Sequence, residues 1–350
     1  MNPDENWNLL SSFVHKAIRL LEKKAITHAE AFFTSTHATE VAIRNSEIHT
    51  QNRADDCGVG FRVAIATNRV GFACTNTLKE KAVLETAEKA FDVARVSSEE
   101  VNFALPEACK PPEVKGLFDS RVVQMDVEEG VDVARRLIQA AEDFDKRVVA
   151  KDGRVLFEFG WRGIVNTFGV DFEERETEAI IYLGGGGEQD GEVTSSCFDV
   201  ILSRTAEVEP EKVGENVGRM VIAMFKPHPL KGFQGTAVFG PEVAANHLFV
   251  VLVDALNGGN VVAGRSAWTG KLGQNVASEN MTVTDDALAE KGFASRSFDD
   301  EGARSQNTVL IRKGKLESFL HNATSANALK TRNTGNASRF SSGFDMVRSI

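Results

Sequence analysis

Segments with hydrophobic residues at helical spacing alternate with β-rich runs along the first two thirds of the chain, and this alternation restricts the fold to a mixed one. Four amphipathic helices are expected, over residues 6–24, 78–95, 127–146 and about 210–226. The runs expected to form strands are Ala29–Thr34, Glu40–Arg44, Val59–Ala66, Val70–Thr75, Val155–Phe159, Gly163–Phe168 and Glu176–Leu183. The pattern predicts an α+β protein in which a sheet is flanked by helices.

Two short segments are expected to end strands. Thr67-Asn68-Arg69 separates two β-rich runs and predicts a hairpin. The glycines Gly184–Gly187 are expected to end the strand that precedes them. They lack the lysine and the Ser/Thr of a phosphate-binding loop, so we interpret them as a strand end or loop.

A change in composition near residues 228–235 predicts a domain boundary. Pro227, Pro229 and Gly232 punctuate this stretch. We therefore expect an N-terminal mixed α/β domain over residues 1–230 and a β-rich C-terminal domain over residues 236–350. The second domain is expected to contain a short strand at Thr236–Phe239, an apolar helix from Pro241 to about Leu256, and a hairpin joined at Lys313-Gly314.

Charge and composition exclude several classes of function. The 350 residues carry a net charge of −10 and contain no Lys/Arg run, which argues against nucleic-acid binding. No stretch approaches the length of about 20 apolar residues that a membrane span requires, and the start of the sequence has no apolar signal core. The four cysteines are scattered, as is typical of reduced thiols. These features predict a cytoplasmic protein with no membrane association.

Motifs in the second half point to a known family. They are Phe239-Gly240-Pro241-Glu242 before an apolar helix, Gly264-Arg265-Ser266 with Gly270-Lys271-Leu272-Gly273, Phe298-Asp299-Asp300-Glu301-Gly302, and Thr334-Gly335-Asn336-Ala337-Ser338. In this order they resemble the TldD/PmbA (TldE) family, peptidase U62, also called modulator of DNA gyrase. The resemblance implies a two-domain protein that dimerises around an internal chamber and takes unfolded peptides. It also implies that TldD-type members bind zinc through His-Glu-x-x-x-His on the helix after Pro-Glu, with a third ligand in a C-terminal segment.

The chain departs from the catalytic type at this motif. When Pro241-Glu242 is aligned with the family's Pro-Glu, the two histidine positions are Phe249 and Asp254, and the general-base position is Val250. A phenyl ring cannot ligate a metal, and one carboxylate does not hold zinc. We expect no catalytic residue and no metal site in this chain, which resembles the PmbA/TldE type. Family members also continue beyond the point at which this sequence stops, so the C-terminal domain is expected to be truncated.

The acidic motif at residues 299–301 has two possible interpretations. Asp299, Asp300 and Glu301 do not match the ligand spacing of a calcium loop. We interpret them mainly as a tight structural turn, and we also consider them as candidates for a partner interface or a peptide-binding site.

The function that the resemblance implies is that of a non-catalytic subunit. The chain would pair with a TldD-like, zinc-bearing paralogue as a heterodimer, or with itself, and would form a chamber wall that binds peptide substrates. Two alternatives stay open: an autonomous metallopeptidase with an atypical site, and a regulatory protein-binding module.

Overall fold

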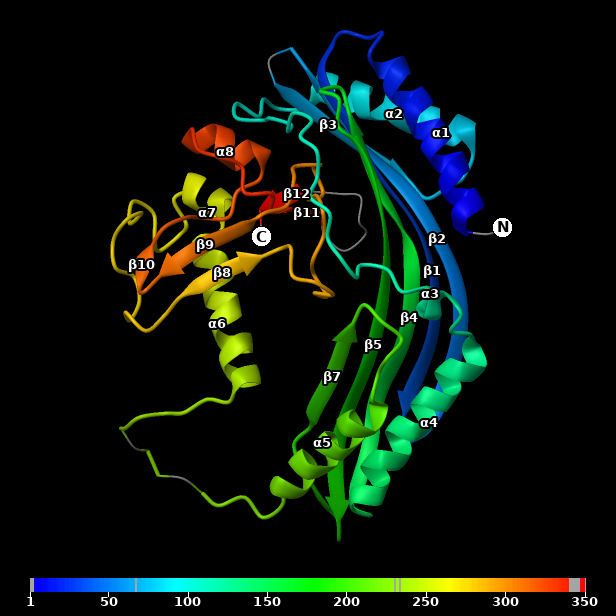
Figure 1. Ribbon diagram of the computed structural model, residues 1–350, viewed down its shortest axis with the longest axis vertical. Coiled ribbons are helices and arrows are strands. Elements are labelled where there is room, and N and C mark those ends of the chain that lie inside the picture. The colour runs from blue at the N-terminus through cyan, green and yellow to red at the C-terminus, as the bar shows by residue number, and fades with distance from the viewer. Residues whose placement is uncertain (1–2, 67, 230, 233, 340–346, 350) are drawn as a thin grey trace.

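The structure, a computed structural model, has two parts that face each other. It describes residues 3–66, 68–229, 231–232, 234–339 and 347–349. One part is a long, curved sheet with helices on its outer face, and the other is a smaller C-terminal unit packed against the upper inner face (Figure 1). The predicted α+β class is confirmed.

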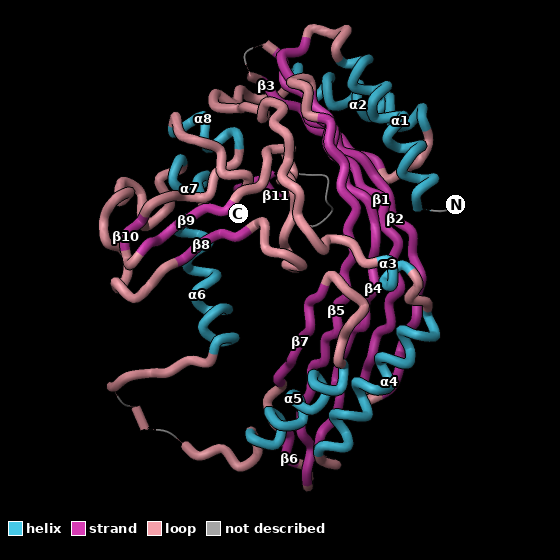
Figure 2. The backbone as a smooth tube through the Cα atoms, viewed as in Figure 1, coloured by secondary structure: helices cyan, strands magenta, loops and turns pink. Residues whose placement is uncertain are grey.

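The large sheet is antiparallel throughout the pairings of its described strands. Its strands run in the order β3-β2-β1-β4-β5, and β5 pairs on its other side with both β6 and β7. The strands are β1 (Ile26–Arg44), β2 (Glu47–Ile65), β3 (Arg69–Thr75), β4 (Val148–Asn166), β5 (Asp171–Gln189), β6 (Glu192–Val193) and β7 (Cys197–Ser203). Four of them have 19 residues, a length of about 60 Å at ordinary strand rise. Strands of this length accumulate twist, and the sheet curls (Figure 2).

The strands are longer than the sequence predicted. Ala29–Thr34 and Glu40–Arg44 are one strand, β1, because the residues between them pair with β2 and β4 on both sides. Val155–Phe159 and Gly163–Phe168 similarly fall in or beside the single strand β4. The turn that ends β1 is Asn45-Ser46, with φ of 49° and 60°, a conformation that suits tight hairpins. Thr67, in the hairpin predicted from sequence, lies outside the described residues.

The prediction that Gly184–Gly187 ends a strand is wrong. β5 continues through these glycines to Gln189. The reason is close packing of a helix rather than a turn. A Cβ on Gly185 would lie 2.3 Å from Val217 Cγ1, and one on Gly187 would lie 2.5 Å from Phe225 Cε2. Only glycine at these two positions leaves room for α5 and Phe225 to approach the sheet so closely.

Helices cover the outer face of the sheet, and the four predicted amphipathic helices are confirmed. They are α1 (Pro3–Leu21), α2 (Glu80–Val96), α4 (Val127–Phe144) and α5 (Pro210–Ala223), with a short α3 (Ser120–Val123). Helices α1 and α2 bury one core against strand residues such as Phe33, Phe61 and Val63. Helices α4 and α5 bury a second core against Val41, Phe157 and neighbouring strand residues. In β1, both cores use odd-numbered residues, so the even-numbered residues face inward.

The C-terminal unit contains one long helix and several short elements. They are α6 (Pro241–Leu256), α7 (Gly258–Val262), β8 (Val283–Asp286), β9 (Asn307–Arg312), β10 (Lys315–Leu316), α8 (Ala323–Leu329), β11 (Ala337–Arg339) and β12 (Val347–Ser349). The predicted apolar helix and the hairpin at Lys313-Gly314 are confirmed. The predicted strand at Thr236–Phe239 is wrong, because this segment lies in the connection before α6 and pairs with no described strand. No helix within the described ranges is long and apolar enough for a membrane span.

Candidate functional site

The acidic turn Asp299-Asp300-Glu301 lies inside the molecule, where the C-terminal unit meets the sheet. Asp299 and Glu301 are fully buried. The Asp299 carboxylate accepts backbone N–H groups from Glu301 at 3.0 Å, Ala303 at 2.9 Å and Ala337 at 2.9 Å. Burial and the neighbouring Glu301 raise the pKa of Asp299 to about 7, although the three N–H donors favour the charged form. Asp299 therefore organises the turn itself.

Buried ion pairs connect this turn to the sheet. Arg62 of β2 lies 2.8 Å from Glu301 and 2.7 Å from Glu30 of β1. Arg339 of β11 donates to the same Glu30 at 2.5 Å. Burial raises the pKa of Glu301, and the Arg62 guanidinium opposes that shift. Because buried charges that lose a partner are strongly destabilising, this cluster holds the C-terminal unit in one position on the sheet.

Arg162 of β4 is the second connection between the two parts. Its guanidinium meets Glu174 at 2.8 Å and Asp300 at 3.2 Å, and it donates to the Phe298 carbonyl at 2.6 Å. The Phe298 ring lies under the same guanidinium, 4.5 Å away. The three acidic residues that the sequence singled out therefore make intramolecular contacts. Their proposed part in a partner interface or in peptide binding stays a prediction.

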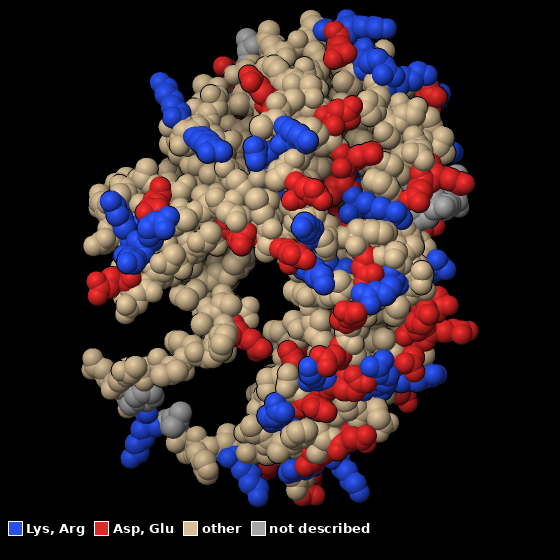
Figure 3. Space-filling model, viewed as in Figure 1, with Lys and Arg blue, Asp and Glu red and all other residues tan. Residues whose placement is uncertain are grey.

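Beside this junction is a cleft of about 740 Å³ between the inner face of the sheet and the C-terminal unit. Figure 3 shows that the space between the sheet and the chain leading into α6 is open. The sheet side of the cleft is lined by Arg162, Glu176, Glu178 and, just after β7, Arg204. The α6 side is lined by Phe249 and Val253. The C-terminal unit lines it with Asp285 and Asp286 of β8 and with Arg296 of a loop. The cleft thus combines these charged groups with apolar ones such as Phe32, Trp161 and Phe293, and α6 contributes only apolar side chains.

Helix α6 carries the degenerate metal-motif positions, and these residues do not fit zinc. Phe249 and Val250 are 62% and 65% exposed and offer no lone pair. Asp254 lies away from them, at a second pocket that it lines with Asn257 and Asn260. The described residues contain no group of three His, Cys, Asp or Glu side chains that could hold a metal ion.

Three glutamates form a second feature of the inner face, which we call the acidic row: Glu158, Glu176 and Glu178. Glu158 of β4 is directly opposite Glu178 of β5. Arg204 lies 3.1 Å from Glu176 and 3.6 Å from Glu178. Burial and the negative charges of Glu178 and Glu176 raise the pKa of Glu158 to about 7, and burial raises that of Glu178. This row was not predicted from the sequence, although Glu174-Arg175-Glu176-Thr177-Glu178 has the alternation that places carboxylates on one face.

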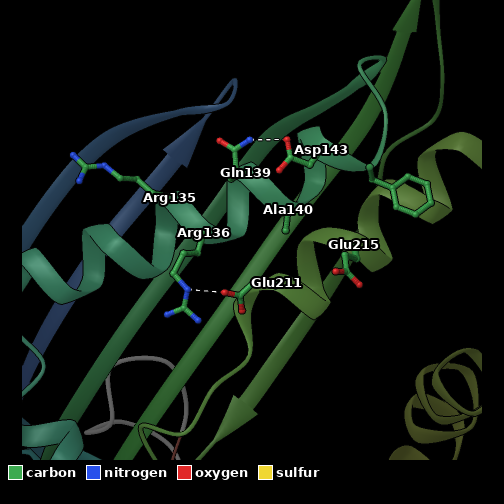
Figure 4. Close-up of a pocket in the computed structure, with 8 residues that line it drawn as sticks. Arg135, Arg136, Gln139, Ala140, Asp143, Glu211 and Glu215 are labelled. Atoms are coloured by element: carbon green, nitrogen blue, oxygen red, sulfur yellow. Dashed lines mark hydrogen bonds and ion pairs between the residues drawn. The ribbon is translucent and has the colours of Figure 1, made fainter.

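Another pocket, of about 680 Å³, lies between α4 and α5 on the outer side of the sheet (Figure 4). The side chains of Arg136 and Glu211 are paired across it at 2.6 Å, and Gln139 donates to Asp143 at 2.7 Å. This pocket is a groove between two packed helices and faces away from the cleft.

Most of the chain is similar to known protein domains. The chain matches, in order, models of the PmbA/TldA metallopeptidase domain 1 over residues 29–94, the central domain over 121–225 and the C-terminal domain over 234–349. These are domains of metallopeptidases. The chain belongs to the PmbA/TldD family.

Individual relatives agree with this assignment. The chain is 28% identical over 330 residues to an uncharacterised protein of Methanocaldococcus jannaschii, covering 93% of this chain and 74% of that protein. It is 26% identical over 339 residues to metalloprotease PmbA of Escherichia coli O157:H7, covering 94% and 73%.

Solved structures support the same fold. The crystal structure of TldE from Thermococcus kodakarensis superposes with a TM-score of 0.85 at 24% identity, covering 97% of this chain and 76% of that one. A Thermotoga maritima protein whose name refers to modulation of a DNA gyrase superposes with a TM-score of 0.81 at 21% identity, covering 97% and 76%. At these identities the superpositions establish the fold alone.

Proposed function

We propose that this chain is a non-catalytic subunit of a cytoplasmic zinc metallopeptidase assembly. It forms one wall of an internal chamber and holds peptide substrates there, while a TldD-like paralogue supplies the zinc and the general base. The observation that carries the proposal is the exposed apolar surface of α6, next to the cleft.

Helix α6 is apolar around most of its circumference, yet little of it is buried by this chain. Of its residues, only Ala255 and Leu256 are buried. The large hydrophobic residues exposed on the helix and just before it are Val238, Phe239, Val243, Leu248, Phe249, Val250 and Val251. A helix that is hydrophobic on all sides is typical of a buried element, and a large exposed apolar patch marks an interaction surface. A second chain that encloses α6 satisfies both observations.

The site chemistry favours a positioning role over a catalytic one. Phe249, Val250 and Asp254 supply neither a zinc site nor a base, whereas the family is one of metallopeptidases. The cleft beside α6 contains charged groups that can orient a peptide, and orientation lowers the barrier of a reaction whose catalytic groups come from another chain. Extended peptides bind through main-chain hydrogen bonds and therefore tolerate many sequences.

Co-expression with a paralogue that carries His-Glu-x-x-x-His tests this proposal. Light scattering after size-exclusion chromatography should show a heterodimer, and the complex should cleave a disordered peptide that this chain alone leaves intact. Val250→Lys should break the complex because it places a charge within the apolar surface of α6. Val96→Lys is the matched control, since Val96 is 84% exposed at the end of α2. Peptidase activity of this chain alone, or unchanged assembly of the Val250→Lys variant, would overturn the proposal.

A further inference from the structure

An apolar strip on the inner face of the sheet is left uncovered. It consists of Phe198, Val200 and Leu202 of β7 with Ile180 and Tyr182 of β5, and Ile180 and Tyr182 lie opposite Leu202 and Val200. Phe198 and Leu202 are 54% and 51% exposed. The odd-numbered residues of β7 face the other way, and Cys197 and Ile201 pack on the core beneath α5. Alternation therefore places the large apolar side chains of β7 on the face that the cleft shares.

The acidic row continues this strip directly. Along β5, Glu176 and Glu178 precede Ile180 and Tyr182 on the same face, and Glu158 lies opposite Glu178. Like charges that lie directly opposite each other destabilise a sheet. Arg204 meets Glu176 and Glu178, but Glu158 is in no ion pair with any described residue. The inner face thus presents, at one end of an apolar surface, a crowded group of carboxyls in which Glu158 has no ion-pair partner among the described residues.

The free edge of β7 is blocked at its centre. The backbone N–H of Val200 donates to the Asp199 side chain at 2.8 Å, and Asn216 holds the other carboxylate oxygen of Asp199 at 2.9 Å. A peptide that joined the sheet as a further strand would have to displace this bond. We therefore expect a peptide bound at the strip to lie on its face and to be held by side-chain contacts.

We propose that the apolar strip and the acidic row together form a docking surface for an extended peptide in which apolar residues alternate and are followed by a lysine or arginine. The inference rests on the proposed function and specifies which peptides the chamber wall favours. Along β5 the row and the strip run from Glu176 to Gly184, which lies opposite Phe198, so together they accommodate a segment of about nine extended residues. A cationic residue complements the unpaired Glu158, whereas a second copy of this chain, with its net charge of −10, does not.

Fluorescence anisotropy with the full chain and two labelled nonapeptides tests the proposal. Both peptides alternate leucine with serine; one ends in arginine and the other in glutamate. The arginine peptide should bind about tenfold more tightly. Glu158→Gln combined with Glu178→Gln should remove that preference without weakening the glutamate peptide. Leu202→Ser should weaken both peptides about tenfold because a buried leucine contact is lost. Val96→Ser, at an exposed site remote from the strip, should change neither.

Several results would overturn the inference. Equal affinity for the two peptides would exclude the acidic row, and wild-type binding by Leu202→Ser would exclude the strip. If sedimentation shows that Leu202→Ser converts a dimer of this chain to monomers, the strip is an interface between copies. Because the anisotropy measurement uses this chain alone, its result can be interpreted even if no paralogue associates with the chain. Intact association with a paralogue but no peptide preference would refute this inference and leave the proposed function standing.

Discussion

Replacing Glu158 with glutamine should stabilise the protein at alkaline pH and have little effect at acidic pH. The pKa of Glu158 is raised from 4.5 to about 7 by burial and by the carboxylates of Glu178 and Glu176. Each pKa unit corresponds to about 1.4 kcal/mol, which gives an upper limit of about 3.5 kcal/mol for the cost of ionising Glu158 in the folded state. Residual contact with solvent reduces this value, so we expect about 2 kcal/mol.

The sign follows from proton binding. Between pH 4.5 and about 7 the folded state holds a proton that the unfolded state has lost, so the stability of the wild-type protein falls as pH rises through this window. Above about pH 7 this loss of stability is complete and no longer changes with pH. Glutamine cannot ionise, so the variant lacks this loss. Its advantage over the wild type should therefore appear between pH 4.5 and 7 and remain level at pH 8.

Urea unfolding of both proteins at pH 4.5, 6 and 8 measures the effect. Other titrating groups are common to the two proteins and cancel in the difference. Glu215→Gln, at an exposed position on α5, is the control and should show no such trend. A difference between Glu158→Gln and the wild type that is the same at all three pH values would refute the reasoning, because it would mean that Glu158 titrates normally.

Three further predictions follow from the packing. Arg162→Met should lower the free energy of unfolding by about 3–5 kcal/mol in urea titrations, because it leaves Glu174 buried without its ion-pair partner and removes one of the two arginines that pair with Asp300; a loss below 1 kcal/mol would contradict this. Gly71→Ala should lower the melting temperature, since a Cβ there would lie 2.1 Å from a backbone oxygen of α2, whereas Gly240→Ala, with open space around it, should not. Phe249→Ser should leave the unfolding of the isolated chain unchanged but weaken its association with a paralogue, measured by titration calorimetry, because this ring is exposed in the single chain; equal affinity would count against an interface at α6.

The helices could be predicted from sequence because their signal is local. The spacing of residues such as Val133, Leu137 and Ala141 indicates a helix without knowledge of its partner. The full length of the strands could not be found in this way. Residues Ser35–Thr39 are mostly polar, and they form a strand because both neighbours supply hydrogen bonds. The glycines of β5 also looked like a strand end, since the close approach of α5 is a tertiary contact.

In the candidate site, too, features set by single side chains could be predicted from the sequence, whereas features set by tertiary contacts could not. The unsuitability of Phe249 and Val250 as zinc ligands follows from their side chains alone. The acidic row depends on the register that sets Glu158 against Glu178, and no local pattern fixes that register. The ion pair between Glu30 and Arg339 joins residues 309 positions apart. The acidic turn could therefore be recognised from the sequence, but the arginines that form ion pairs with it could not.

Elemental analysis of zinc, in the purified chain and in its complex with a His-Glu-x-x-x-His paralogue, tests the central claim most directly. After mild dialysis, we predict less than about a tenth of an equivalent in this chain and about one equivalent per complex. One tightly held zinc in the chain by itself would contradict the account. It would mean that ligands other than those at Phe249, Val250 and Asp254 form a metal site, and that this chain is a peptidase in its own right.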